Sequence, residues 1–189
     1  HVVKLLSTPD ATDFVAYGRV YSGTVRPGSR VRVLGEAYTP EDPEDARACV
    51  VAGVSVCHGR HCTEVAEAGP GNCVLLEGVG AHVAKTATVV DADEAVVEDE
   101  AAVFETLRFD DVAVVKLAVE PLNPAELPKM TEGLRKISKS YPLARTRVEE
   151  SGEHVVLGTG ELYLDCIMHD LREMYSSVEV KVADPVVAF

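Results

Sequence analysis

Residues 57–62 hold the densest set of metal-binding side chains in the sequence. They read Cys-His-Gly-Arg-His-Cys. Thiolates and imidazoles are preferred zinc ligands, so Cys57, His58, His61 and Cys62 form a weak candidate metal site. Structural zinc sites usually add a second pair of ligands far along the chain, whereas here all four ligands would crowd one tight turn. A strand–turn–strand with buried thiols and surface histidines is the alternative that this spacing favours.

A second candidate is the segment Gly158-Thr159-Gly160-Glu161, which joins a predicted strand to a predicted helix. Backbone amides at a helix N-terminus can hold an anion. The segment lacks the third glycine of a dinucleotide fingerprint and the Lys-Ser/Thr of a P-loop, and Glu161 would repel phosphate. We interpret it as a tight turn, in which a side chain at either glycine would force an unfavourable φ.

Carboxylates and an imidazole cluster at Glu149, Glu150, Glu153 and His154, on either side of a Ser151-Gly152 turn. Such groups can do acid–base chemistry. Adjacent residues of a hairpin point to opposite faces, so at most two of these side chains converge. Charged hairpin edges are the commoner explanation. We therefore predict no catalytic and no cofactor-binding residue.

The 189 residues carry a net charge of −13, which excludes a protein that coats nucleic acid through clustered Lys and Arg. Any RNA contact must be local. Residues 91–106 hold seven acidic and no basic side chains, so we predict an acidic linker at 91–108. No apolar run approaches the roughly 20 residues of a membrane span, which predicts no membrane partner. The five cysteines, without a secretory context, are expected to be reduced thiols.

The two sides of this linker have different hydrophobic periods. Residues 1–90 contain short β-branched runs separated by Gly, Pro and Asp, which predicts a β-barrel domain. The runs are Val2–Leu6, Phe14–Tyr21, Arg30–Leu34, Ala48–Val56, Cys73–Leu76 and Thr86–Val90. Residues 109–185 predict a strand, a helix, two strands, a helix and a closing strand, which is an α+β ferredoxin-like (βαββαβ) domain. The first helix is predicted to start at Asn123 or, as the alternative, to have Pro128 in its first turn. The predicted later elements are Val112–Val119, Thr146–Glu149, His154–Leu157, Glu161–Tyr175 and Val178–Val182.

Several longer motifs resemble elongation factor 2 and its relatives. They are Ala16–Gly23, Val33–Pro40, Lys85–Thr88, Ala118–Pro124, Leu127–Lys129, Val148–His154, Gly158–Asp165 and Ala183–Val187. The first three resemble the β-barrel second domain, the others the third domain, and 186–189 the start of the next. Elongation factor 2 usually reads Gly-Ala-Gly-Glu-Leu-His-Leu-Glu at the seventh motif, where this chain has Thr159, Tyr163 and Asp165. With Lys139–Pro142 and Cys166–Arg172, these residues make the chain similar to the spliceosomal elongation-factor-2-like GTPases of the U5 small nuclear ribonucleoprotein.

The resemblance implies a non-catalytic fragment of a nuclear pre-mRNA splicing GTPase. In such a parent, a GTPase domain preceding His1 would hold GTP and magnesium, so this fragment alone should not bind GTP. The fragment would relay GTP/GDP state to the C-terminal domains during spliceosome activation and disassembly. Implied partners are the parent's other domains, a large scaffold protein, a helicase and a local small nuclear RNA contact. The alternative is the same fragment of a ribosomal translocation factor. The Gly158–Glu161 turn, with Glu149, Glu150, Gly152 and His154, would serve as an interdomain or structural motif.

Overall fold

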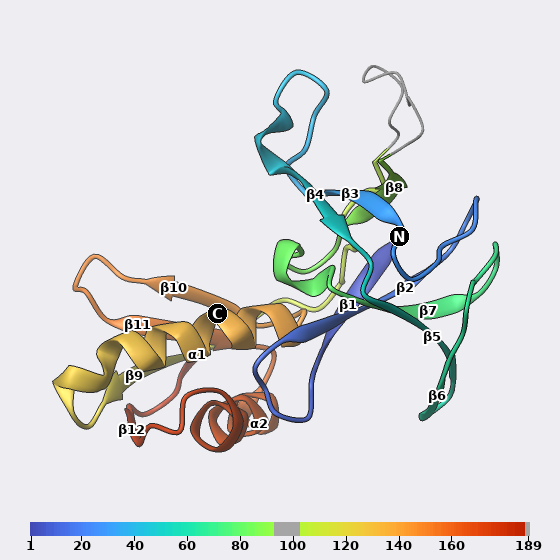
Figure 1. Cartoon of the computed structure of the whole chain (residues 1–189). Coiled ribbons are helices and arrows are strands. Elements are labelled where there is room, and N and C mark those ends of the chain that lie inside the picture. Colours follow the sequence, from blue (N-terminus) through green and yellow to red (C-terminus); the bar gives the residue numbers. More distant parts are fainter. Residues whose placement is uncertain (93–102, 188–189) are drawn as a thin grey trace. The chain divides into compact units, whose positions relative to one another are not determined.

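The computed structural model describes residues 1–92 and 103–187, and the chain forms two compact units, His1–Leu107 and Arg108–Phe189 (Figure 1). The first unit is all antiparallel sheet and the second combines a sheet with helices. Most of the predicted acidic linker, 91–108, falls outside the described residues. The limits of this linker, and those of the predicted domains 1–90 and 109–185, stay predictions.

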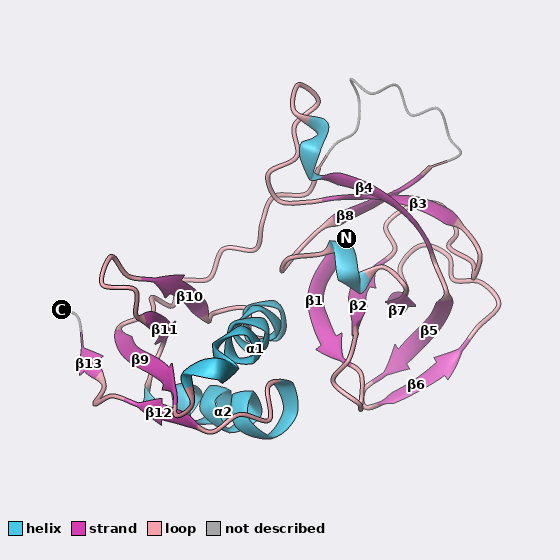
Figure 2. Cartoon of the chain, turned by 60° about the vertical axis from the view of Figure 1, so that its left-hand side comes forward, coloured by secondary structure: helices cyan, strands magenta, loops and turns pink. Residues whose placement is uncertain are grey.

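The first unit consists of two antiparallel sheets that Figure 2 shows curving around a shared interior. A five-stranded sheet has the order β1-β2-β7-β5-β6, and a three-stranded sheet has the order β4-β3-β8. A bridge between Val2 and Ala87 connects the two sheets. The strands are β1 (Val2–Ser7), β2 (Phe14–Arg19), β3 (Arg30–Leu34), β4 (Ala46–Val50), β5 (Gly53–His58), β6 (His61–Glu64), β7 (Cys73–Glu77) and β8 (Thr88–Asp91).

Buried and exposed side chains alternate along β3 of the first unit, as the sequence predicts. Val31 and Val33 of β3 are buried, while Arg30 is exposed and Arg32 is half-buried. This is the pattern of a strand with one face toward a core. Two short 3-10 helices, η1 (Pro43–Asp45) and η2 (Gly80–His82), lie between strands. The acidic segment at η1 forms a surface turn, as its carboxylates require.

One prediction for the first unit is wrong: residues 48–56 are two strands rather than one. β4 pairs with β3, and β5 pairs with β7, so the chain leaves one sheet and enters the other between them. At the crossing, Val51 donates to Ser29 O at 3.0 Å and accepts from Gly28 N at 2.7 Å. Val51 is also fully buried. These backbone bonds fix the change of sheet, which an unbroken β-branched run does not reveal.

The second unit has a four-stranded antiparallel core sheet, in the order β10-β11-β9-β12. Figure 2 shows both helices on one side of these strands. The side chains of Leu117, Val119, Val156, Ile137 and Ile167 are buried in this unit. Its elements are β9 (Val115–Pro121), η3 (Pro124–Glu126), α1 (Leu127–Ser140), β10 (Arg145–Val148), β11 (His154–Gly158), α2 (Glu161–Asp170), η4 (Leu171–Tyr175), β12 (Val180–Val182) and β13 (Val186–Val187). The predicted βαββαβ order is confirmed.

Both predicted helices differ from the structure at one end. Asn123 caps the short 3-10 helix η3, its Oδ1 accepting from Ala125 N at 3.1 Å. Helix α1 follows with Pro128 in its first turn, which confirms the alternative start. The predicted helix Glu161–Tyr175 ends as α2 at Asp170 and continues as one π-helical turn, η4, closed by Ser176 N donating to Leu171 O at 3.0 Å. The wider turn changes the phase of the buried face, which a regular 3.6-residue period does not predict. No helix in the described part of the chain has both the length and the apolar character needed to span a membrane.

The edge of this sheet continues past β12. Val186 and Val187 pair with Lys116 and Val115 of β9. The segment 186–189 was predicted to start the next domain. Its two described residues instead extend the sheet of the second unit. Ala183, between β12 and β13, donates to Ala118 O at 3.0 Å and keeps the segment alongside β9.

Gly133 tests how closely α1 packs against η4. A Cβ at this position would lie 2.7 Å from Leu171 Cδ1 and 3.0 Å from Ser176 Cβ, and Leu171 is fully buried. We expect Gly133→Ala to lower the free energy of unfolding by about 1–2 kcal/mol, because overpacking exceeds the gain of about 1 kcal/mol in helix propensity. Urea unfolding measures this. The exposed position Arg135, changed to Ala, is the control, and a stabilised Gly133→Ala variant would contradict the close packing.

Candidate functional site

The turn from β11 into α2 is the most specific motif of the sequence, and it contains two glycines in different surroundings. Gly158 ends β11 and Gly160 precedes the first residue of α2, Glu161. Gly160 has an extended backbone, with φ −178°, and its carbonyl accepts from Leu164 N at 3.1 Å. The exposed carboxylate of Glu161 lies in the first turn, where it complements the helix dipole. The turn thus starts the helix without a side-chain cap.

The expectation that side chains at these glycines force an unfavourable φ is wrong. Neither Gly158 nor Gly160 has a positive φ. A Cβ on Gly158 would instead lie 2.9 Å from Leu164 Cδ2 and 3.1 Å from Tyr163 Cδ1, whereas a Cβ on Gly160 would meet nothing within 4 Å. The constraint at Gly158 is therefore close packing against α2, and Gly160 is free of it.

A tyrosine cluster lies between the C-terminal end of α1 and the side of α2. The rings of Tyr141 and Tyr163 meet edge to face, with centroids 5.6 Å apart. Tyr141 donates a hydrogen bond of 2.5 Å to Asp170 Oδ2, and His169 Nδ1 lies 3.3 Å from Asp170 Oδ1. Burial, followed by this bond to Asp170, raises the pKa of Tyr141 above its ordinary value. Tyr141 therefore stays a neutral donor to Asp170 at physiological pH.

Tyr163 contributes an apolar ring whose hydroxyl group is buried. Burial raises its pKa, and the hydroxyl lies near the backbone of Leu143 and Ala144. Among the described residues it has no hydrogen-bond partner. The cluster joins two motifs that distinguish this chain from elongation factor 2, the Lys139–Pro142 segment and Tyr163. Sequence reasoning named both motifs without foreseeing that they touch.

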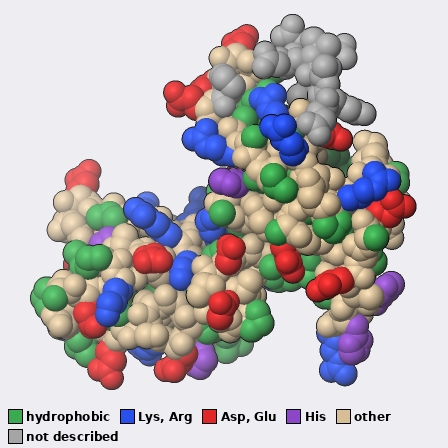
Figure 3. Space-filling view, in the orientation of Figure 1, with side chains coloured by type: hydrophobic (Ala, Val, Ile, Leu, Met, Phe, Trp, Pro, Cys, Tyr) green, Lys and Arg blue, Asp and Glu red, His purple; other side chains and the backbone are tan. Residues whose placement is uncertain are grey.

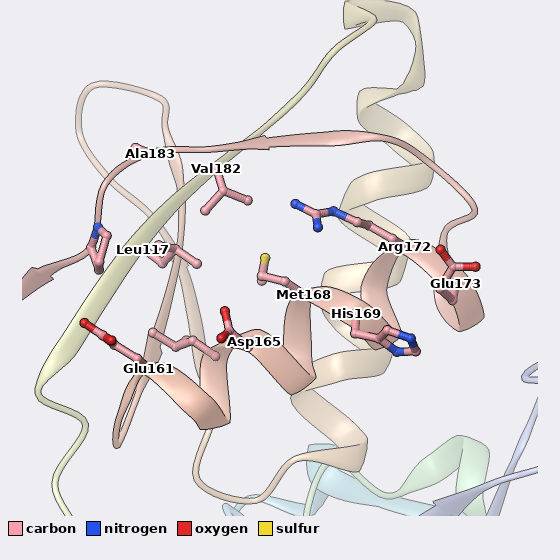
Figure 4. A pocket seen from close by; sticks show the side chains of 11 residues that line it. Leu117, Glu161, Asp165, Met168, His169, Arg172, Glu173, Val182 and Ala183 are labelled. Atoms are coloured by element: carbon pink, nitrogen blue, oxygen red, sulfur yellow. The ribbon is translucent and has the colours of Figure 1, made fainter.

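Another side of α2 borders a groove of about 570 Å³ (Figure 4). Glu161, Asp165 and Met168 of α2 line it, and Val182 and Ala183 lie across from them. Arg172 reaches over the groove, its Nη2 donating to Val180 O at 3.3 Å. Asp165, a third residue that departs from elongation factor 2, thus lies in a groove wall, while Tyr163 packs elsewhere on the same helix. The sequence analysis did not predict this groove, because its two walls are distant in sequence.

The β10–β11 hairpin has one ionic cluster, around Glu149. Lys116 Nζ and Arg147 Nη2 each lie 2.8 Å from Glu149 Oε1. The bonds from Lys116 and then Arg147 lower the pKa of Glu149 below its ordinary value of 4.5. Lys116 comes from β9, so the carboxylate connects the hairpin to the centre of the sheet. Glu149 therefore has a structural role, as one partner of two basic side chains.

The remaining hairpin residues do not form an acid–base site. Gly152 takes a φ of +87° in the turn and donates to Glu149 O at 2.9 Å. His154 pairs with Val148 across the strands, so strand alternation directs its side chain to the face opposite Glu149. Glu150 is exposed, and Glu153 accepts from Ser151 Oγ at 3.1 Å. At most two of the three carboxylates and the one imidazole share a face of the hairpin, as strand alternation predicts.

The candidate metal ligands lie on the β5–β6 hairpin. Cys57 pairs directly with Cys62, and His58 with His61. Neighbouring pairs of a hairpin point to opposite faces, so the thiols and the imidazoles do not converge. No group of three or more metal-binding side chains is placed to hold an ion among residues 1–92 and 103–187. The segment forms the strand–turn–strand of the alternative interpretation. Its thiols are not buried as that interpretation expected, because Cys57 is half-buried and Cys62 is exposed.

Comparison with protein families agrees with the two units. Residues 13–90 match the family described as Elongation factor Tu domain 2, and residues 112–184 match Elongation Factor G, domain III. Each unit is therefore similar to a domain of the elongation factors. This confirms the predicted fold class, a β-barrel domain followed by a ferredoxin-like domain.

Three relatives are similar over all 189 residues. The 110 kDa U5 small nuclear ribonucleoprotein component CLO of Arabidopsis thaliana is 57% identical, and the 109 kDa component GFL of the same plant is 56% identical. Pre-mRNA-splicing factor cwf10 of Schizosaccharomyces pombe is 48% identical. The chain spans 19% of the length of each of these relatives. The resemblance inferred from the motifs is thereby confirmed.

Serine substitutions test the two glycines of the turn. We expect Gly158→Ser to lower the free energy of unfolding by about 1–3 kcal/mol, because the new Cβ overlaps Leu164, which is 2% exposed. Gly160→Ser is the matched control and should stay within about 0.5 kcal/mol of the unchanged chain, since the space around it is open. Chemical denaturation measures both variants, and equal losses would contradict the packing argument.

The Glu149 cluster predicts a pH dependence. A carboxylate whose pKa is lowered by folding stabilises the protein above its unfolded pKa, and this contribution is lost as pH falls through the folded pKa. Glu149→Gln should therefore lower the melting temperature at pH 7, and the difference should shrink below pH 4.5. Glu150→Gln, at an exposed neighbour, is the control. A deficit that persists unchanged at pH 3 would show that Glu149 does not act through its charge.

Proposed function

We propose that this chain is the second- and third-domain part of a spliceosomal GTPase that functions in the U5 small nuclear ribonucleoprotein. The observation that carries the proposal is 57% identity to a U5 component, continuous over all 189 residues. Tyr163 adds a physical argument, since it contacts Tyr141 in the motif that also distinguishes the chain from elongation factor 2. In this proposal the chain itself is non-catalytic, and GTP and magnesium bind to another domain of the parent.

The function would be to relay GTP or GDP state toward the C-terminal domains of the parent, in spliceosome activation and disassembly. A relay needs parts that move as units and interfaces with two stable packings. Contacts inside the second unit support the first requirement. Gly133 of α1 packs on Leu171 and Ser176, the tyrosine cluster joins α1 to α2, and Glu149 joins the hairpin to β9. A displacement at one helix would therefore move the whole unit.

The partners would be mainly proteins: the parent's other domains, a large scaffold protein and a helicase, in the nucleus. A net charge of −13 opposes broad RNA binding. The strands β9 and β11 carry no Phe, Tyr or Trp side chain on which a base could stack. A small nuclear RNA contact would have to be local and made to phosphates, for example by Arg145 and Arg147 of β10, of which Arg147 also binds Glu149.

Affinity purification of the full-length parent tests the assignment. We expect U5 small nuclear RNA to be recovered with the tagged protein. Recovery of ribosomes without spliceosomal RNA would replace the proposal with the translocation-factor alternative.

A pair of variants in the same full-length protein tests the relay. Tyr163→Ala removes the contact with Tyr141, whereas Tyr163→Phe keeps the ring and removes only the hydroxyl group that lacks a partner among the described residues. We expect Tyr163→Ala to reduce splicing in extracts at least several-fold while GTP binding is retained, and Tyr163→Phe to behave like the unchanged protein. Full splicing activity with Tyr163→Ala would argue against a relay through this cluster.

A further inference from the structure

The β5–β6 hairpin presents a pair of thiols that neither the fold nor the proposed function uses. We propose that Cys57 and Cys62 are a reversible dithiol site, which small disulfides of the glutathione class convert to an intramolecular disulfide. The two sulfur atoms are 3.5 Å apart, within a weak S–H···S hydrogen bond. The proposal concerns the thiols alone and does not depend on the metal interpretation of the same segment.

The hairpin register places the two side chains suitably for this bond. His58 and His61 flank a two-residue turn, in which Gly59 has a φ of +61°. A glycine with positive φ at the first central position is typical of a type II′ turn. The pair next to the turn exchanges backbone hydrogen bonds, so Cys57 and Cys62 form the following, non-hydrogen-bonded pair. The Cα atoms of such pairs are typically about 4.5 Å apart, within the range of roughly 4.4–6.8 Å that disulfides span.

The site is also accessible. All four residues of β6 are exposed, and β6 is an edge strand that pairs only with β5 within the five-stranded sheet. Figure 3 shows His and Lys or Arg side chains at the end of this hairpin. Cys62 itself is exposed, so a tripeptide disulfide can reach its sulfur. Positive charge near a thiol favours approach of the anionic glutathione molecule.

The reaction balances with glutathione disulfide as the oxidant. The Cys62 thiolate attacks one sulfur of glutathione disulfide, forms a mixed disulfide and releases one glutathione thiolate. The Cys57 thiolate then attacks Cys62 Sγ, forms the protein disulfide and releases the second glutathione. Two protein thiols are oxidised and one glutathione disulfide is reduced to two glutathione molecules, which take up, by way of solvent, the two protons that the protein thiols lose. Excess glutathione reverses both steps.

Cys57 is the less reactive thiol in the first step, because its surroundings favour the protonated form, and it therefore acts in the second step, where the attack is intramolecular. Burial and then the bond with Cys62 raise its pKa from 9.0 to about 11. Cys62 of β6, Cys73 of β7 and Tyr17 of β2 are the titratable groups that influence it across the sheet. No positive charge is among them. Closure should therefore speed up as pH rises from 7 to 9, because the thiolate fraction of Cys57 increases.

The test uses the 189-residue chain, glutathione disulfide at defined ratios to glutathione, acid quenching and mass spectrometry of peptides. We expect a disulfide joining Cys57 to Cys62 without bound glutathione, reversed by excess glutathione. Cys57→Ser should instead accumulate one glutathione on Cys62, because the second step is lost. Cys166→Ser, at an exposed cysteine outside the hairpin, is the matched control and should close normally. A persistent glutathione adduct on Cys62 in the unchanged chain, or a bond from Cys57 to Cys73, would overturn the proposal.

A comparison of folded and unfolded chains separates the hairpin from mere closeness in sequence. The equilibrium constant for closure against glutathione should be at least tenfold larger in buffer than in concentrated guanidinium chloride, because the hairpin aligns the two thiols. Circular dichroism of the serine variants verifies that they fold. Equal constants in the two conditions would show that the hairpin does not favour the bond.

Discussion

The burial of one face of the β10-β11-β9-β12 sheet by α1 and α2 is the constraint on which the second unit depends. Val119 and Val156 of the sheet and Ile137 and Ile167 of the helices are fully buried in this core. Tightly packed interiors transmit displacement rather than absorb it. The turn at Gly158 lies where the sheet meets α2, and packing there leaves no space for a Cβ. The motif that carries the resemblance to the elongation factors is therefore also a packing requirement.

Polar groups add connections that this core does not supply. Glu149 joins Arg147 of the hairpin to Lys116 of the central strand, and Tyr141 joins the end of α1 to Asp170 at the end of α2. Each of these bonds joins two different elements, and hydrogen bonds are directional where hydrophobic contacts are not. These contacts connect the hairpin to the central strand and the end of α1 to the end of α2.

Much of the fold could be predicted from local patterns. The alternation in Arg30–Leu34 identified a strand with one buried face, and the two helices followed from the spacing of their apolar residues. The failures have a common cause. The change of sheet at Val51 is fixed by backbone hydrogen bonds to residues 28 and 29, and the π turn at Leu171–Tyr175 is closed by the bond from Ser176 N to Leu171 O. Such bonds leave no periodic trace in the sequence.

The sequence by itself determined the resemblance to the elongation factors and the order of most of the elements, because both depend on residue types and local spacing. Tertiary structure decided which of those residues meet. It separated the imidazoles of His58 and His61 from the thiols of Cys57 and Cys62, and it brought Tyr141 to Tyr163. Faces and distances between segments follow from strand register and helix packing, and these are fixed only when the chain folds.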